Sequence, residues 1–325
     1  MTKTNGNELR TPPGHQRDDP RGRAVKELWY FVPAAYIGAW LVATPLWLTG
    51  FRRAAPSQHA GPLVAACLFT MMVVPAAVAI LLTRWRHPWR DVPRVLSLGL
   101  PRPRRRVVAQ CLWASTVFVA ITLVGLIPAA LSGMYRPAWP QSAWSLLALP
   151  LSAIVSLPLY LGEEIGWQGY MMPRLTLRFG TVTGICVGGV LWGLWHLPMT
   201  ALGGSYPGHP LYIAIPAAVA VAVAAGAIIA VIRIRTHSVW PAVAAHLGLN
   251  EFALPLPQLT AASDHAPDPL FVGPLSLITW PIMMIAGGIA LYTISGAGHR
   301  HNGRPGSPAD DGSGAWTSWP NRRRY

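Results

Sequence analysis

The sequence predicts an all-α protein, a polytopic membrane helical bundle with about eight transmembrane helices. Three observations lead to this prediction. Of the 325 residues, 52% are hydrophobic and only 12% are charged, whereas a soluble domain is nearer one-quarter charged. Apolar stretches of roughly 20 residues, each enough to cross a ~30 Å hydrocarbon layer, recur along the chain. Basic residues gather in alternate connecting segments, as the positive-inside rule requires.

The apolar stretches follow one another along most of the chain. We expect transmembrane helices at 28–50, 61–83, 107–132, 143–173, 181–200, 211–232, 238–256 and 271–293. The fourth stretch is longer than one crossing needs, and Pro150 and Pro158 should kink it. Together the eight form a predicted transmembrane bundle over 28–293. Residues 1–27 and 294–325, rich in Arg, Gly and Pro, are predicted to be a disordered cytoplasmic arm and tail.

The basic residues predict the orientation of the chain. With eight spans, the side that holds both tails carries 23 Lys and Arg, and the opposite side carries three, Arg52, Arg53 and Arg136. This asymmetry places both termini in the cytoplasm. The high pI of about 10.7 therefore indicates contact with the lipid bilayer and its anionic headgroups, and we expect no nucleic-acid partner. Because arginine outnumbers lysine 24 to 2, a GC-rich bacterial genome and a bacterial inner membrane are expected.

Acidic residues are scarce in the apolar part of the chain. Between Asp91 and Asp264 there are only Glu163, Glu164 and Glu251. An ionised carboxylate in hydrocarbon is costly unless it is neutralised or paired. Polar groups kept at such depth are therefore candidates for function.

The first candidate cluster is Glu163 and Glu164 with Gln168. Adjacent residues on a helix point about 100° apart, so the two carboxylates cannot face one point equally. Glu164 and Gln168 are i, i+4 neighbours, which predicts a hydrogen bond along one helix face. One glutamate would then meet a reacting centre while the other is structural. The alternative is that the pair only caps the interfacial end of the fourth helix.

Two further clusters lie on the fifth and seventh predicted helices. Trp192 stands one turn before His196 and should cover one face of its imidazole. His246 and Asn250 share a helix face at i, i+4 spacing, and Gly248 between them should let another helix approach closely. The alternative for both clusters is that they are hydrogen-bonded packing residues that hold helices together.

Depth brings the clusters into one layer. At ~1.5 Å per residue, Glu163, His246 and His196 lie about 16, 14 and 24 Å from the ends of their helices, and helix tilt allows a shared mid-membrane pocket. A carboxylate and an imidazole can activate water, while a second imidazole and an amide can donate to an oxyanion. Alternatively, these three residues could hold zinc and a water, although the chain has no His-Glu-x-x-His helix.

Taken together and in this order, the three runs resemble the CPBP (Abi) family of intramembrane proteases, which includes the type II CAAX prenyl endopeptidases. The family's motifs are Glu-Glu-x-x-x-Arg, Phe-x-x-x-His and His-x-x-x-Asn/Asp. Here they read Glu163-Glu164-x-x-x-Gln168, Trp192-x-x-x-His196 and His246-x-x-x-Asn250. The resemblance covers roughly residues 140–255, the protease-like core of the predicted bundle.

This resemblance implies an intramembrane endopeptidase that acts on a peptide or membrane-protein segment entering from the cytoplasm or the bilayer. Carried over by motif, Glu163 and His196 would activate water, and His246 and Asn250 would stabilise the tetrahedral oxyanion. Glu164 fills the second glutamate position and would support the first. The family has been described both as a metalloprotease and as glutamate-based, so a zinc cofactor remains open.

Two positions depart from the family's pattern. Trp192 in place of Phe keeps an aromatic ring and is expected to be harmless. Gln168 in place of Arg is more serious, because a guanidinium would hold a neighbouring carboxylate ionised through charge-assisted bonds. We expect lower activity, or an optimum at higher pH, than in the Gln168→Arg variant.

Two other functions stay open. The first is a catalytically inactive family member that acts as an immunity, scaffold or peptide-binding membrane protein, which the glutamine favours. The second is a transporter or proton channel, which would also use buried Glu and His side chains. The sequence has no internal repeat, which argues against the inverted-repeat transporter folds.

Overall fold

The computed structural model describes residues 19–52, 61–140 and 142–302, and its fold is all-α, as predicted. Within these ranges the only β-pairing is one isolated bridge between Pro137 and Ala261. Five helical segments are long and apolar enough to cross a membrane. They are α1 (Pro20–Leu48), α2 (Pro62–Arg86), α4 (Arg104–Leu131), the segment Trp144–Phe179 and α9 (Leu211–Thr236). The chain is therefore a multi-pass membrane protein by length and composition.

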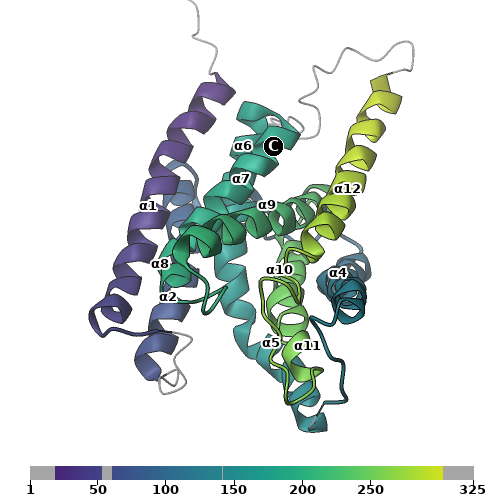
Figure 1. Ribbon diagram of the computed structural model, residues 1–325. Coiled ribbons are helices and arrows are strands. Elements are labelled where there is room, and N and C mark those ends of the chain that lie inside the picture. Colours follow the sequence, from purple (N-terminus) through teal and green to yellow (C-terminus); the bar gives the residue numbers. More distant parts are fainter. Residues whose placement is uncertain (1–18, 53–60, 141, 303–325) are drawn as a thin grey trace, which may run out of the picture.

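Shorter helices complete the bundle. After α2 come η1 (Trp89–Asp91) and α3 (Val92–Val95), and the fourth long segment divides into α5 (Ala143–Glu164), η2 (Ile165–Met171) and α6 (Met172–Phe179). The rest are α7 (Thr181–Trp195), α8 (Leu197–Ala201), α10 (Val239–Leu247), η3 (Gly248–Ala253), α11 (Leu256–Leu259) and α12 (Thr279–Asn302). Figure 1 shows α1 and α12 at opposite flanks, with α5, α7, α9 and α10 between them.

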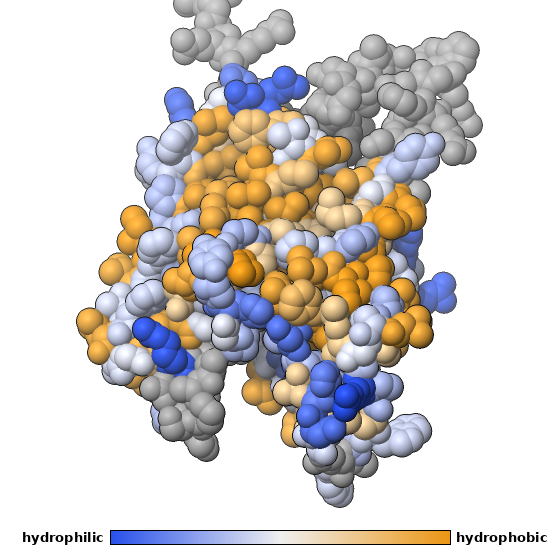
Figure 2. All heavy atoms as spheres, viewed as in Figure 1, coloured by the Kyte–Doolittle hydropathy of each residue, from blue (hydrophilic) through white to orange (hydrophobic). Residues whose placement is uncertain are grey.

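The surface carries large apolar side chains where lipid would meet it. Leu41, Leu112, Ile154 and Ile285 are all exposed. Figure 2 shows hydrophobic residues over much of one face, with hydrophilic residues gathered beside the start of α1 and at the opposite end. Because a water-facing surface would rarely expose so much apolar area, this pattern is typical of a lipid-facing bundle.

Helix ends differ from the predicted boundaries at three places. α1 begins at Pro20, inside the predicted arm, because the Asp19 side chain caps it by accepting the N–H groups of Arg21 and Gly22. α12 extends past residue 293 to Asn302. Its predicted start at 271 is wrong: residues 271–278 form turns, and the helix starts at Thr279. The remainder of the predicted arm and tail, 1–18 and 303–325, lies outside the described residues.

The fourth predicted span contains an irregularity that the sequence reading did not locate. α5 is continuous through Pro150 and Pro158, and the change of backbone geometry comes later, where η2 is a π-helix. The seventh span makes the same change, since η3 is also a π-helix. Single π-turns within α-helices occur frequently at functional sites.

Close helix contacts position these segments. A Cβ at Gly248 would lie 2.2 Å from the backbone oxygen of Ser115 in α4, so the predicted close approach at this glycine is confirmed. A Cβ at Gly189 would lie 2.6 Å from the Cα of Val223 in α9. Only glycine permits such backbone contact, which fixes η3 on α4 and α7 on α9.

Candidate active site

Four predicted catalytic side chains meet at one cavity of about 650 Å³. Glu163 comes from the last turn of α5, His196 follows α7, His246 lies in the last turn of α10, and Asn250 lies in η3. Trp192 lines the same cavity. The helices thus bring together residues that lie up to 87 positions apart in the sequence, as the shared-pocket interpretation required. The catalytic roles of these residues remain predictions.

The two adjacent glutamates face different surroundings. Glu163 faces the cavity, is 1% exposed, and its Oε2 accepts a 2.9 Å hydrogen bond from the Trp192 indole N–H. Glu164 is equally buried but does not line the cavity. Its Oε1 lies 2.8 Å from His246 Nδ1. This division agrees with the angle of about 100° between consecutive helical side chains.

Glu164 fixes the orientation of the His246 ring. An ionised carboxylate only accepts hydrogen bonds, so Nδ1 carries the proton and Nε2 is the nitrogen not engaged by Glu164. The ring also packs edge-on against Trp192, with centroids 5.1 Å apart, and against Tyr160 at 4.9 Å. His246 is therefore held on several sides, with a carboxylate partner that favours its charged form.

His196 has a different partner at the same ring nitrogen. Its Nδ1 lies 2.8 Å from the backbone oxygen of Trp192. A carbonyl oxygen cannot donate, so Nδ1 carries the proton and Nε2 of the neutral ring keeps its lone pair. The ring packs edge-on against Trp192 and Trp195, with centroids 5.4 and 4.8 Å away. The predicted contact between Trp192 and His196 is present, but it is a T-shaped ring contact together with a hydrogen bond to the Trp192 backbone, and not a stacked cover over the imidazole.

Asn250 is the most exposed of the predicted catalytic amide and carboxylate groups. It is half-buried, and its Nδ2 donates a 3.2 Å hydrogen bond to the backbone oxygen of His246. An amide nitrogen carries two hydrogens, so one remains for a ligand in the cavity. The cavity therefore combines a carboxylate, one imidazole with a free lone pair, a second imidazole beside a carboxylate, and an amide donor.

Comparison with known proteins matches part of the chain to a family. Residues 139–252 match the family described as type II CAAX prenyl endopeptidase Rce1-like, and this range contains all five predicted catalytic residues. Residues 139–252 form an Rce1-like domain. A curated relative, CAAX prenyl protease 2 of Methanococcus maripaludis, is 36% identical over 44 residues. That match covers 14% of this chain and 16% of the relative.

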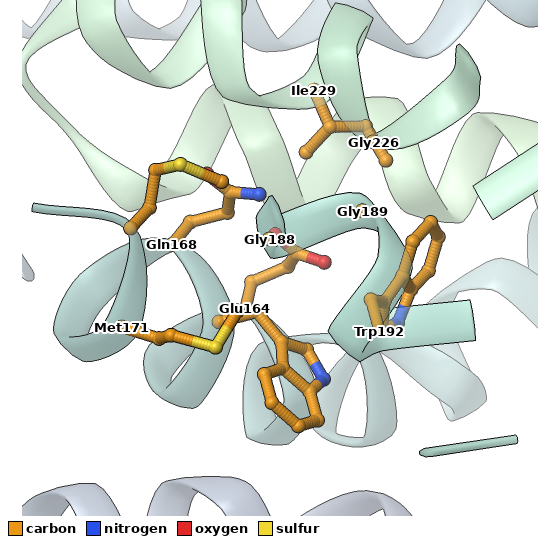
Figure 3. A pocket seen from close by; sticks show the side chains of 10 residues that line it. Glu164, Gln168, Met171, Gly188, Gly189, Trp192, Gly226 and Ile229 are labelled. Carbon is orange, nitrogen blue, oxygen red and sulfur yellow. The ribbon is translucent and has the colours of Figure 1, made fainter. Parts of the chain in front are cut away.

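At the arginine position of this Rce1-like domain the structure has Gln168, which is 5% exposed. The predicted hydrogen bond to Glu164 is absent among the described residues, because the π-helix η2 begins directly after Glu164 and changes the i, i+4 register. Glu164 Oε2 and Gln168 Oε1 have no hydrogen-bond partner there. Both residues line a separate void of about 10 Å³, close to the size of one water (Figure 3).

Two residues of the Rce1-like domain support the site without having been predicted. Tyr160 donates a 2.6 Å hydrogen bond to Glu251 Oε1, and Ser152 bonds to the other oxygen of the same carboxylate. Glu251 thus links η3 to α5 through two hydrogen bonds, and it does not merely mark the interfacial end of its helix. The sequence does indicate that Glu251 needs a partner, since it is one of three acidic residues in the apolar region. Its partners lie 91 and 99 positions away and no local pattern marks them.

The three residues predicted as zinc ligands, Glu163, His196 and His246, line the same cavity. No group of three His, Cys, Asp or Glu side chains in the described part of the chain is arranged to hold a metal ion. Glu163 accepts from Trp192 through Oε2, and the Nδ1 atoms of His196 and His246 bond to a backbone carbonyl and to Glu164, so the other carboxylate oxygen and both Nε2 atoms are the candidate donors. These residue types and their Nδ1 partners are compatible with a metal, and the mechanism below uses only the side chains of the cavity. A zinc cofactor remains a prediction from residue types.

Proposed function

We propose that this protein is an intramembrane endopeptidase that hydrolyses a peptide bond in a peptide or membrane-protein segment with an activated water. The observation that carries the proposal is the different Nδ1 partner of each histidine. A backbone carbonyl keeps His196 neutral and basic at Nε2, whereas Glu164 favours a protonated His246 that donates through Nε2. One imidazole then accepts protons and the other donates hydrogen bonds.

The reaction follows from these states. A water in the cavity gives its proton to His196 Nε2, with Glu163 orienting it, and its oxygen attacks the carbonyl carbon of the substrate. The carbonyl electron pair moves to oxygen, and the oxyanion receives hydrogen bonds from His246 and Asn250. When the C–N bond breaks, the leaving amine takes the proton back from His196. Glu164 acts through His246 and is a positioning residue.

The experiment is a cleavage assay with purified protein in detergent, using a peptide library and mass spectrometry. We expect Glu163→Gln, His196→Ala and His246→Ala each to lose about 10²-fold or more in kcat/KM, as is typical for acid–base and oxyanion groups. Gln258→Ala is the matched control, because this exposed side chain lines the cavity from α11, which carries none of the predicted catalytic residues, and it should retain activity. Activity retained in His246→Ala would refute the oxyanion assignment.

Metal dependence is tested in the same assay. The mechanism above predicts that a chelator leaves the rate unchanged. Loss of activity on chelation, restored by zinc, would instead support the zinc prediction.

We further propose eight membrane crossings in a bacterial inner membrane, with both termini in the cytoplasm. The five long segments, the shorter apolar helices α7 and α12, and the pair α10–η3 account for the eight. The start of α1 and the end of α12 lie at the same side of the molecule in Figure 1, which supports an even number of crossings.

A second candidate is a non-catalytic peptide-binding member, such as an immunity or scaffold protein. Gln168 favours it, because the site lacks the guanidinium of the family motif and two buried oxygens have no hydrogen-bond partner among the described residues. Hydrolysis by purified protein that disappears in Glu163→Gln would eliminate this candidate. Peptide binding without hydrolysis would support it.

A further inference from the structure

The cavity lies entirely in one half of the bundle. From α2 (Pro62–Arg86) its lining takes Leu68, Met71 and Met72, and from α9 (Leu211–Thr236) it takes residues between Ala218 and Ala225. α7 contributes only its last turns, from Trp192 onward. On α2, α7 and α9 the lining residues lie mainly in the half of the helix nearer the same end of the molecule, and α5 contributes Leu159, Tyr160 and Glu163 near the middle of the segment Trp144–Phe179. The cavity therefore has a definite direction across the bundle.

That direction is away from the basic ends of the helices. Arg84 and Arg86 lie in the last turn of α2, and Arg233 and Arg235 lie in the last turn of α9, opposite to the ends that line the cavity. α6 does not line the cavity, and it too carries an arginine, Arg178, in its last turn. By the positive-inside rule, the basic ends are cytoplasmic and the cavity lies in the extracytoplasmic half.

The cavity reaches the surface on its own side. Its lining includes the exposed residues Pro207 and Gln258, and both belong to connections at the ends remote from the arginines. Two connections form its rim, 202–210 and 254–278. They are joined by the Tyr206 hydroxyl, which donates to the backbone oxygen of Leu275 at 2.7 Å, and by His209 Nε2, which lies 3.0 Å from both oxygens of Asp268. Burial raises the pKa of Tyr206, so it remains a donor at physiological pH.

The basic side is closed over the site. The segment after α3 folds beneath η2, where Leu96 is fully buried and its backbone oxygen would lie 2.9 Å from a Cβ at Gly169. This segment is bonded to the start of α10, since Trp240 Nε1 donates to Leu98 O at 2.9 Å and Val239 N donates to Ser97 O at 3.1 Å. None of these residues lines the cavity.

From this geometry we infer that the substrate enters from the extracytoplasmic side, so the scissile bond belongs to an exported peptide or to an outward-facing segment of a membrane protein. The inference rests on the proposed function, and it replaces the expectation of entry from the cytoplasm or bilayer. The cavity wall also defines the class of side chain that fits. Among the described residues that line it, Glu163 and the two histidines are the only ionisable groups apart from tyrosines. An uncharged, mainly apolar peptide segment matches this wall.

The first test is thiol labelling from each side of the membrane. In a background lacking Cys67, Cys111 and Cys186, single cysteines are introduced by Gln258→Cys at the rim and by Arg94→Cys on the basic side, where the native side chain is 63% exposed. An impermeant maleimide should label Gln258→Cys in right-side-out vesicles and Arg94→Cys only in inside-out vesicles. The reverse pattern, or equal labelling of Gln258→Cys from both sides, would overturn the inference.

The second test is cleavage by sided vesicles. An impermeant apolar-core peptide that purified protein hydrolyses in detergent is added to each vesicle type. We expect hydrolysis at least 10-fold faster with right-side-out vesicles, and in detergent a maleimide on Gln258→Cys should slow cleavage while one on Arg94→Cys should not. Faster cleavage by inside-out vesicles would refute outward entry. Absence of hydrolysis in detergent would refute the protease proposal instead, and the labelling pattern would still report which way the cavity opens.

Discussion

At the scale of single residues, Trp192 is the side chain that organises the site. Its indole N–H bonds to Glu163, its backbone oxygen accepts from His196, and its ring packs against both imidazoles. The expectation that tryptophan is a harmless replacement for phenylalanine was based on the aromatic ring alone and did not include the indole N–H. A phenyl group has no donor, so in this chain the tryptophan holds Glu163 in a way that phenylalanine would not.

We therefore predict that Trp192→Phe lowers kcat/KM by about 10-fold, because a hydrogen bond to a charged group is worth about 1.5–3 kcal/mol. The matched control is Trp195→Phe. That indole is in the same helix and equally buried, but it donates to the backbone oxygen of Ala35 at 3.3 Å. Steady-state kinetics of both variants is the measurement, and equal losses in the two would show that the effect is one of packing alone.

Gln168 carries a second prediction at this scale. In Gln168→Arg, the guanidinium would lie beside Glu164 and favour its ionised form, so the acid limb of the pH–rate profile should move to lower pH. Gln168→Met is the control, since it fills similar space without charge. Profiles of all three proteins that coincide would contradict the role assigned to this position.

At the scale of elements, the two π-helices explain why the motifs are arranged as they are. Glu164 immediately precedes η2, and Asn250 lies within η3. A purely α-helical reading of the spacings predicted the pocket correctly but also predicted a Glu164–Gln168 bond that does not form. The long apolar helices could be predicted, because about 20 apolar residues have few alternatives in a membrane. The bond between His246 and Glu164 could not, because it joins residues 82 positions apart.

The start of α12 is a second feature that the sequence pattern does not predict, and here the deciding contacts are local. Residues 271–278 are mostly apolar and read as part of a span, yet they form turns. Ser276 ends this run by accepting the Thr279 backbone N–H at 3.3 Å. The apolar composition of a segment predicts that it lies in an apolar environment. It does not predict the residue at which a helix starts, because that depends on hydrogen bonds from one or two side chains.

The close packing of η3 on α4 leads to a prediction about stability. Gly248→Ala would place a Cβ 2.2 Å from the Ser115 backbone oxygen, so we expect it to lower the Tm in detergent by several degrees, at a cost of about 1–3 kcal/mol. Gly288→Ala in α12 is the control, because its Cβ would meet nothing within 4 Å. Thermal unfolding of both variants tests this, and an unchanged Tm in Gly248→Ala would mean that the two helices separate without cost.

At the scale of the whole molecule, the arginines at the helix ends and the opening of the cavity lie on opposite sides. Both ends of the chain are proposed to lie with the arginines, so a fluorescent protein fused before Met1 or after Tyr325 should be fluorescent, and alkaline phosphatase fused at either end should be inactive. Alkaline phosphatase inserted after Ser205 should be active. Phosphatase activity at one terminus would show an odd number of crossings and remove the basis for eight.

The joined rim has a consequence for turnover. Since the basic side is closed, both fragments of a cleaved chain must leave through the opening by which the intact chain arrived. Departing fragments then pass the Tyr206–Leu275 and His209–Asp268 links, which hold the two rim connections together and limit how far the opening can widen. Release of products, rather than bond breaking, is the step that these links would make slow.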